Sequence, residues 1–285
     1  MTTLDRRLHA FRPDLADIHL QGRVDARHFV SAKPACIAVP VADVKSAPDA
    51  AAGMDTQFLL GDEVGVFERR GGWAWVQGRR DMYVGYVAED ALAPCGPGAT
   101  HQVAVPRSFA YPEPDMKRPV TRHLSLGGRV AIEARAQTRG LAYGQTEAGD
   151  WVVMGHLGPL DGQPLTADHA AVAEQLLHTP YLWGGTSAFG IDCSGLVQLA
   201  FRMAGRDVVR DTDMQAANLG DMIAREDLRR GDLVFWTGHV GIMTDADTLI
   251  HANGHTMTVA LENLDAAIAR IGYLYGQPTA FRRVQ

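Results

Sequence analysis

The chain has 285 residues, a formal net charge of −6, 46% hydrophobic residues and 21% charged residues. This length predicts about two domains with a substantial core, and the composition is that of an ordinary globular protein. The acidic balance disfavours binding to nucleic acid or anionic lipid through bulk charge. The longest apolar run, residues 35–44, is interrupted by Pro40 and Asp43 and falls short of the roughly 20 residues of a membrane helix.

The N-terminus and the cysteines together predict the compartment. The first residues carry charges and lack the apolar segment of a secretory signal. The three cysteines, Cys36, Cys95 and Cys193, are scattered, and an odd, sparse count argues against a disulfide framework. We therefore expect a cytoplasmic protein in which Cys36 and Cys95 are inert packing residues.

Two stretches of the N-terminal half resemble each other at a constant offset of 66 residues. Residues 37–40 (Ile-Ala-Val-Pro) match residues 103–106 (Val-Ala-Val-Pro), and Leu60-Gly61 matches Leu126-Gly127. A gap-free offset predicts a duplicated unit. Both copies contain short alternating segments separated by glycine turns, which is typical of small β-barrels and resembles bacterial SH3-like domains. We place these two domains at residues 35–95 and 100–160.

The segments on either side of the repeats have different patterns. Before them, Leu4, Leu8 and Phe11 at helical spacing predict an N-terminal arm, residues 1–34, with one short helix. After the linker of residues 159–164, Thr166 is a suitable N-cap for a helix over residues 167–178. A second helix is predicted over residues 193–204, followed by Gly205 at the C′ position. Strands are expected at residues 233–236, 240–243, 249–252 and 280–282, so residues 165–285 predict an α+β domain.

Cys193 is expected to be the first residue of a helix. The unpaired backbone N–H groups and the dipole of a helix N-terminus stabilise an anion, so this position predicts a lowered thiol pKa and a reactive thiolate. A buried structural cysteine is the alternative at this point.

Two histidines favour the catalytic interpretation. His239 and His251 lie in adjacent predicted strands joined by the turn residues 245–248, which brings the two side chains opposite or diagonal to each other. Such a pair supplies a base for Cys193 and a second imidazole to orient that base. A zinc site would use the same residue types, but neither a H-E-x-x-H nor a C-x-x-C motif is present.

Five motifs in order resemble the NlpC-type family of papain-like murein endopeptidases. They are Pro180-Tyr-Leu-Trp-Gly-Gly185, Gly190-Ile-Asp-Cys-Ser-Gly-Leu196, Arg230-Gly-Asp-Leu-Val-Phe-Trp236, Gly238-His-Val-Gly-Ile242 and His251-Ala-Asn253. The resemblance implies a papain-like catalytic domain with Cys193 as nucleophile, His239 as general base and His251 as the polar third member. It also implies that Tyr181 lines the site and helps to stabilise the oxyanion.

Two SH3-like domains before such a catalytic domain resemble the γ-D-glutamyl-L-diamino acid endopeptidases of murein-peptide recycling. In these enzymes the first SH3-like domain helps to select peptides with a free N-terminal L-alanine. The resemblance implies that Asp192, Ser194, Asp62 and Tyr83 contact the substrate. Asp62 stands where the family usually has glutamate, and its repeat counterpart is Gly128.

The sequence thus predicts a cysteine peptidase that cleaves the bond between γ-D-Glu and a diamino acid in short murein peptides. No cofactor, metal, nucleic acid, membrane or obligate protein partner is expected. One alternative is a hydrolase or amidase of intact peptidoglycan. An alternative of another class is a non-catalytic wall-binding module in which the SH3-like domains are the active part.

Overall fold

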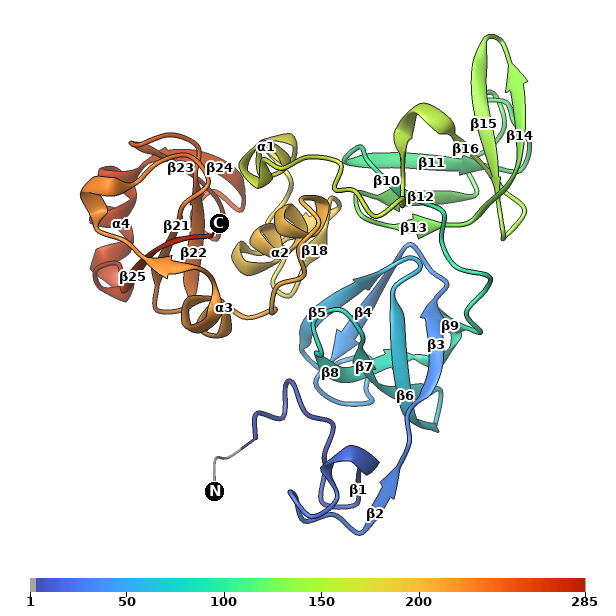
Figure 1. Cartoon of the computed structure of the whole chain (residues 1–285), viewed down its shortest axis with the longest axis horizontal. Helices are drawn as coiled ribbons and strands as arrows, with labels where there is room; N and C mark the ends of the chain where they lie inside the picture. Colours follow the sequence, from blue (N-terminus) through green and yellow to red (C-terminus); the bar gives the residue numbers. More distant parts are fainter. Residues whose placement is uncertain (1–3, 285) are drawn as a thin grey trace. The chain divides into compact units, whose positions relative to one another are not determined.

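The computed structural model describes residues 4–284 and divides into two compact units, Met1–Asp161 and Gly162–Gln285 (Figure 1). The first unit consists mainly of strands, and the second combines helices with one large sheet. Within residues 4–284, no helix has both the length and the apolar character that crossing a membrane requires. Because the structure divides into two units rather than four segments, the finer domain boundaries expected from the sequence remain predictions.

The first unit contains two successive sets of strands after a short arm. The arm holds β1 (Leu15–Asp17), η1 (Ile18–Leu20) and β2 (His28–Val30). The first set holds β3 (Lys33–Ile37), β4 (Val41–Lys45), β5 (Met54–Leu59), β6 (Glu63–Arg70), β7 (Trp73–Gly78), β8 (Val84–Ala88), η2 (Glu89–Ala91) and β9 (Leu92–Ala93). The second set holds β10 (His101–Val103), β11 (Arg107–Tyr111), β12 (Arg122–Ser125), β13 (Arg129–Val130), β14 (Ile132–Thr138), β15 (Leu141–Thr146), β16 (Trp151–Val153), η3 (Met154–His156) and β17 (Leu157–Pro159).

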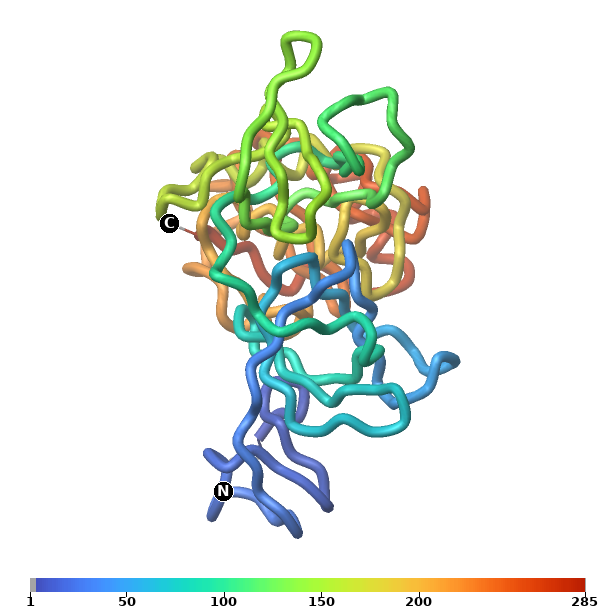
Figure 2. The backbone as a smooth tube through the Cα atoms, turned by 90° about the vertical axis from the view of Figure 1, so that its right-hand side faces the viewer, coloured from blue at the N-terminus to red at the C-terminus, as the bar shows by residue number. Residues whose placement is uncertain are grey.

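The two strand sets repeat the same pairing pattern. The first set forms one sheet in the order β5-β4-β8-β7-β6-β3-β9. The second set pairs its strands in the corresponding way, in two sheets ordered β12-β11-β16-β15-β14 and β13-β10-β17. Both ends of β11 lie 66 residues after the corresponding ends of β4. The β14–β15 hairpin extends beyond the other strands of its set in both views (Figures 1 and 2).

Backbone hydrogen bonds also recur at the offset of 66 residues. In the first set, Gly61 N donates to Ile37 O at 2.9 Å, and in the second set Gly127 N donates to Val103 O at 2.9 Å. The bond from Leu60 N to Pro40 O, 3.1 Å, likewise recurs from Leu126 N to Pro106 O, 3.0 Å. Repetition of both strand order and turn bonding supports the duplication predicted from the sequence.

The helix predicted in the N-terminal arm is absent, and this prediction was wrong. Residues 6–8 form a turn, and Phe11 makes an isolated bridge with Ala16. The Asp5 carboxylate accepts a hydrogen bond from Arg7 N at 2.9 Å, and this local bond competes with helical hydrogen bonding. Ala10 and Leu15 pack instead with Phe67 and Trp75 of the first strand set, so contact with the sheet decides the conformation of the arm.

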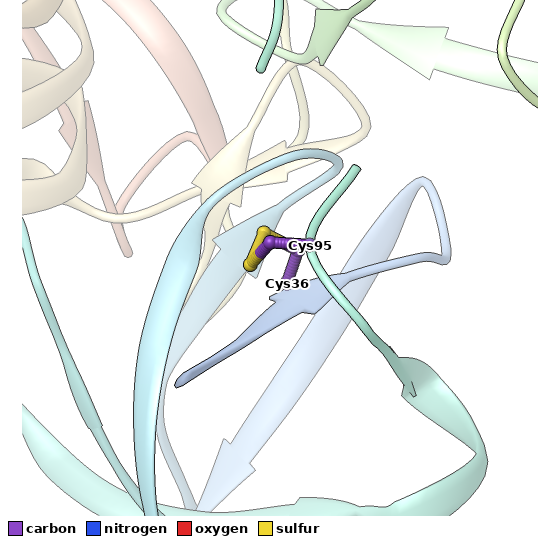
Figure 3. Close-up of a disulfide and its surroundings, with 2 residues drawn as sticks. All are labelled: Cys36 and Cys95. Atoms are coloured by element: carbon purple, nitrogen blue, oxygen red, sulfur yellow. A yellow bond between two sulfur atoms is a disulfide. The ribbon is translucent and has the colours of Figure 1, made fainter. Parts of the chain in front are cut away.

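Cys36 and Cys95 form a disulfide, which corrects the interpretation of both as inert packing residues (Figure 3). The bond joins β3 to the segment that follows β9, across a sequence separation of 59 residues. Disulfides persist mainly in oxidising environments. The cysteine count therefore no longer supports a reducing compartment, and the cytoplasmic location stays a prediction.

The second unit is built on a six-stranded antiparallel sheet. Its strands are β20 (Asp221–Met222), β21 (Leu233–Trp236), β22 (His239–Met243), β23 (Thr248–Asn253), β24 (Thr258–Asn263) and β25 (Ala280–Arg283), in the order β20-β25-β21-β22-β23-β24. The remaining elements are α1 (His169–Gln175), β18 (Thr186–Ser187), β19 (Gly190–Ile191), α2 (Cys193–Met203), α3 (Thr212–Asn218), η4 (Arg225–Asp227) and α4 (Leu264–Tyr275). This agrees with the predicted α+β class.

The helices pack against the sheet through apolar faces. In Figure 1, α2 and α4 lie on opposite sides of it. From α4, Leu264, Ala267, Ile268 and Ile271 join a core with sheet residues that include Trp236 and Leu249. The predicted helix at residues 193–204 is confirmed as α2, and Gly205 beyond it has a φ of +78°. The helix predicted over residues 167–178 is shorter at both ends: it starts later because Asp168 rather than Thr166 caps it, and it ends at Gln175.

The disulfide gives the first testable prediction. Titration of the denatured protein without reductant should find one free thiol per chain, that of Cys193, and three after reduction. With Cys193 blocked, reduction should lower the free energy of unfolding by about 4 kcal/mol, because the closed loop restricts the unfolded chain. Urea unfolding with and without reductant measures this change. Three free thiols in the unreduced protein would contradict the bond.

Candidate active site

Cys193 is held at the first position of α2 by the residues around it. Asp192 is the N-cap, and its Oδ1 accepts a hydrogen bond from Gly195 N at 2.7 Å. Gly195 lies against the backbone of Gly185, and a Cβ at residue 195 would stand 2.2 Å from the Gly185 carbonyl oxygen. The glycine therefore lets the start of α2 approach the preceding loop closely enough to fix Cys193.

The Asp192 carboxylate is fully engaged in a buried network. Arg210, which is 1% exposed, donates from Nη1 to Oδ1 at 3.0 Å and from Nη2 to Oδ2 at 2.6 Å. Gly184 N donates to Oδ2 at 2.9 Å. The Ser194 hydroxyl donates to Asp192 Oδ1 at 3.3 Å and accepts from Arg210 Nη1 at 2.6 Å. Asp192 and Ser194 thus fix the start of the helix, and their role in substrate binding stays a prediction.

His239 and His251 meet diagonally across β22 and β23, as the hairpin argument predicted. The register pairs Ile242 with Ile250, and His239 Nε2 lies 2.8 Å from His251 Nδ1. Gly241 leaves room for this arrangement, because a Cβ there would stand 1.9 Å from Leu249 Cδ1. The side chain of His251 is completely buried.

One cleft of about 650 Å³ brings Cys193, His239 and Tyr181 together. The Cys193 Sγ lies 3.8 Å from Thr212 Oγ1, within hydrogen-bonding reach for sulfur. Other lining residues are Trp183, Thr237, Gly238, Asn253, Gly254, His255, Arg270, Ile271, Leu274 and Tyr275. This volume and the mixture of aromatic and polar walls suit a small organic ligand such as a short peptide.

Burial sets the protonation states of Cys193 and His239. Burial, together with the nearby Asp192 carboxylate, raises the pKa of Cys193 to about 11, although the Thr212 hydroxyl, the Val240 N–H and Arg210 oppose the shift. Burial also lowers the pKa of His239 to about 3, with smaller contributions from His251 and Arg270. The expected lowering of the thiol pKa by the helix N-terminus is therefore wrong, because desolvation outweighs it. Both groups are neutral near pH 7.

Tyr181 presents a protonated hydroxyl to the cleft. Burial and the proximity of Cys193 and Asp192 raise the pKa of Tyr181 above its ordinary value. A phenol that keeps its proton can donate a hydrogen bond to a developing oxyanion. This is consistent with the predicted role, which remains a prediction.

Asp62 and Tyr83 belong to the first unit and are both buried. The Asp62 carboxylate accepts a hydrogen bond from Leu59 N at 2.9 Å and lies 4.0 Å from Arg80 Nε. The backbone N–H of Tyr83 donates a hydrogen bond to Asp81 Oδ1 at 3.0 Å. Both residues thus have local structural partners, and their contact with substrate stays a prediction.

Sequence reasoning missed Glu262 and Arg270. Glu262 Oε2 lies 3.1 Å from His251 Nε2, and Arg270 donates to both carboxylate oxygens of Glu262 at 2.9 and 2.5 Å. Glu262 lies on β24 and Arg270 on α4, and the sequence analysis predicted neither element. The alternating residues 258–263 and the N-cap Asn263 before an apolar periodic segment could have indicated both elements.

Comparison with known proteins identifies the second unit. Residues 178–272 match the model of the NlpC/P60 family, and residues 44–92 match that of the bacterial dipeptidyl-peptidase SH3 domain. The chain contains an NlpC/P60 domain. The resemblance predicted from the five motifs is confirmed, and NlpC/P60 is a family of cysteine peptidases.

Relatives and a solved structure extend this similarity. A γ-D-glutamyl-L-lysine dipeptidyl-peptidase of Bacillus subtilis is 29% identical over 70% of this chain and 72% of its own. A probable endopeptidase of Corynebacterium glutamicum is 38% identical, but the match covers 33% of this chain and only 46% of that protein. The crystal structure of an NlpC/P60 family protein from Bacillus cereus aligns with a TM-score of 0.74 and 22% identity over 88% of this chain and 99% of that one, which shows a shared fold.

The raised pKa of Cys193 predicts how the alkylation rate of its thiol depends on pH. Because the pKa of Cys193 is raised, the thiolate fraction at neutral pH is small and grows as pH rises toward about 11. The rate of alkylation by iodoacetamide should therefore increase about tenfold per pH unit between roughly pH 6 and 9. Labelling that is quenched at successive times and analysed by mass spectrometry measures the rate. A plateau already reached near pH 6 would indicate a preformed thiolate and contradict this electrostatic account.

The buried contacts of Asp192 predict that its removal lowers the free energy of unfolding strongly. Asp192→Ala removes a helix cap and leaves Arg210 buried without its partner, so it should cost about 3–5 kcal/mol in the free energy of unfolding. Asp168→Ala is the matched control, because Asp168 caps α1 and pairs with Arg230 at 2.9 Å on the surface. Loss of that exposed cap and pair should cost only about 1 kcal/mol. Urea unfolding compares the two. Unchanged stability of Asp192→Ala with a raised KM would instead favour a substrate-binding role.

Proposed function

We propose that the chain is a cysteine peptidase that hydrolyses the amide between γ-D-Glu and a diamino acid in short murein peptides with a free N-terminal L-Ala. The observation that carries the proposal is the contact of 2.8 Å between His251 and His239, which lines the same cleft as Cys193. The bond specificity is carried over from the name of the Bacillus subtilis relative. The diamino acid is L-Lys or meso-diaminopimelate.

In the proposed reaction His239 acts as a general base for a neutral thiol. It accepts the proton of Cys193 as Sγ attacks the carbonyl carbon, because the low pKa of the imidazole and the high pKa of the thiol disfavour a stable ion pair beforehand. The imidazolium then protonates the leaving amine as the C–N bond breaks. Water, deprotonated by His239, hydrolyses the thioester and restores the thiol. Tyr181 donates a hydrogen bond to the oxyanion in both steps.

Selection for a free amine is the finer part of the proposal. A peptide ammonium in a desolvated cleft needs a carboxylate partner, and such a charge-assisted hydrogen bond is worth about 1.5–3 kcal/mol. Asp62 and Tyr83 of the SH3-like domain and Asp192 and Ser194 of the NlpC/P60 domain are the proposed contacts. A place in murein-peptide recycling is proposed on the same basis.

The proposal predicts products that mass spectrometry can identify. The wild-type protein should convert L-Ala-γ-D-Glu-L-Lys, or its diaminopimelate counterpart, to L-Ala-D-Glu and the free diamino acid. N-acetylated peptides should react roughly 10- to 100-fold more slowly in kcat/KM, corresponding to one lost ammonium contact. Cys193→Ala should abolish the reaction, and His239→Ala should lower kcat by about 10²–10⁴-fold. His28→Ala, which removes an exposed histidine of β2, is the matched control and should retain activity.

Other outcomes would favour the alternatives. Equal cleavage of free and blocked peptides, with release of products from intact peptidoglycan, would favour a wall hydrolase or amidase. Binding to peptidoglycan without turnover in the wild-type protein would favour the non-catalytic wall-binding module.

A further inference from the structure

Both ring nitrogens of His251 face polar partners in a site that excludes solvent. His251 is completely buried, with Nδ1 2.8 Å from His239 Nε2 and Nε2 3.1 Å from Glu262 Oε2. The carboxylate stands off the ideal direction of a hydrogen bond from Nε2, so the contact is mainly the attraction between a carboxylate and the Nε2–H dipole. Glu262 therefore lies at the nitrogen of His251 that faces away from His239.

Glu262 is fixed in place and in charge by its neighbours. Glu262 pairs with Leu249 in the β23–β24 register, and His251 pairs with Ala260. Glu262 is therefore two residues from the partner of His251 and lies diagonal to it. Arg270 of α4 binds it through Nε to Oε1 and through Nη2 to Oε2. Arg270, followed by His251, lowers the pKa of Glu262 to about 2, so the carboxylate is ionised throughout the physiological pH range.

An ionised carboxylate at this position selects the tautomers of both histidines. Glu262 can only accept hydrogen bonds, so it favours His251 with its proton on Nε2 and with Nδ1 as an acceptor. An accepting Nδ1 on His251 requires His239 to carry its proton on Nε2, because the two nitrogens are 2.8 Å apart. The Nδ1 of His239 is then unprotonated and able to accept the thiol proton.

We propose that Glu262 is a positioning residue for the base, acting through His251, and that Arg270 keeps its carboxylate in place. The inference rests on the proposed function, in which His239 is the base. Glu262 itself touches neither the nucleophile nor the substrate. Its effect is to keep His239 in the tautomer that can deprotonate Cys193.

The distinguishing experiment combines kinetics with the protonation state of His251. Glu262→Ala should lower kcat about 10- to 100-fold with KM changed less than about twofold, because orientation of the base is lost while the cleft is retained. Glu262→Gln keeps an oxygen that can accept from Nε2–H, so its loss should be several-fold smaller. Glu174→Gln is the matched control, because Glu174 forms a comparable bidentate pair with Arg230 on the surface, at 2.7 and 2.8 Å. It should retain wild-type kcat.

Nitrogen NMR gives a readout that a merely structural role would not move. Protonated and unprotonated imidazole nitrogens resonate at well separated shifts, and His251→Gln identifies the signals of this ring. The wild-type protein should show His251 protonated at Nε2 alone, and Glu262→Ala should show a mixture of tautomers.

The outcomes separate this inference from the proposed function. A folded Glu262→Ala protein with wild-type kcat and a single Nε2–H tautomer would overturn the role of Glu262, while loss of activity in Cys193→Ala would still support the peptidase. Full activity of Cys193→Ala would overturn the proposed function itself. If Glu262→Ala unfolds, Glu262→Met decides, because it fills similar space without an accepting carboxylate oxygen: a mixture of tautomers with reduced kcat supports the proposal, and a single Nε2–H tautomer with wild-type kcat overturns it.

Discussion

The buried ion pair between Asp192 and Arg210 is the interaction on which the position of Cys193 depends. Arg210 is almost completely buried, and its charge is compensated by a carboxylate that also caps α2 and binds the loop at Gly184. Removing one partner of such a pair leaves an uncompensated buried charge, which is far more costly than the net stabilisation that the pair provides. The structure of the helix start is therefore sufficient reason for an aspartate at residue 192, without any contact with a ligand.

Desolvation of the cleft explains why the tautomer of His239 has to be controlled by neighbouring groups. In a solvent-exposed site a thiolate and an imidazolium would each be hydrated, but here burial favours the neutral form of both Cys193 and His239. A neutral imidazole can deprotonate the thiol only if the correct nitrogen lacks a proton. Control of the tautomer through His251 therefore matters more in a dry cleft than control of charge, and Glu262 supplies this control from outside the cleft.

Parts of the site that depend on local sequence could be predicted, whereas parts that depend on distant contacts could not. The helix start at Cys193 and the diagonal approach of His239 and His251 follow from capping, periodicity and a short turn. The pairing of Cys36 with Cys95 joins positions 59 apart, and no local pattern indicates it. Likewise, the raised pKa of Cys193 reflects burial by the whole unit, which a helix-terminus argument does not include.

The duplication clarifies which features of the first strand set are needed for folding. Asp62 N donates to Leu59 O at 2.9 Å, and the equivalent Gly128 N donates to Ser125 O at 3.0 Å, so the backbone turn forms in both copies. In the first copy the Asp62 carboxylate adds a bond to Leu59 N, whereas a glycine at the equivalent position cannot. Since the turn forms without a side chain at residue 128, the fold does not require a carboxylate at residue 62. The Asp62 carboxylate is therefore not required for the turn, and the free-amine hypothesis proposes a contact with the substrate for it.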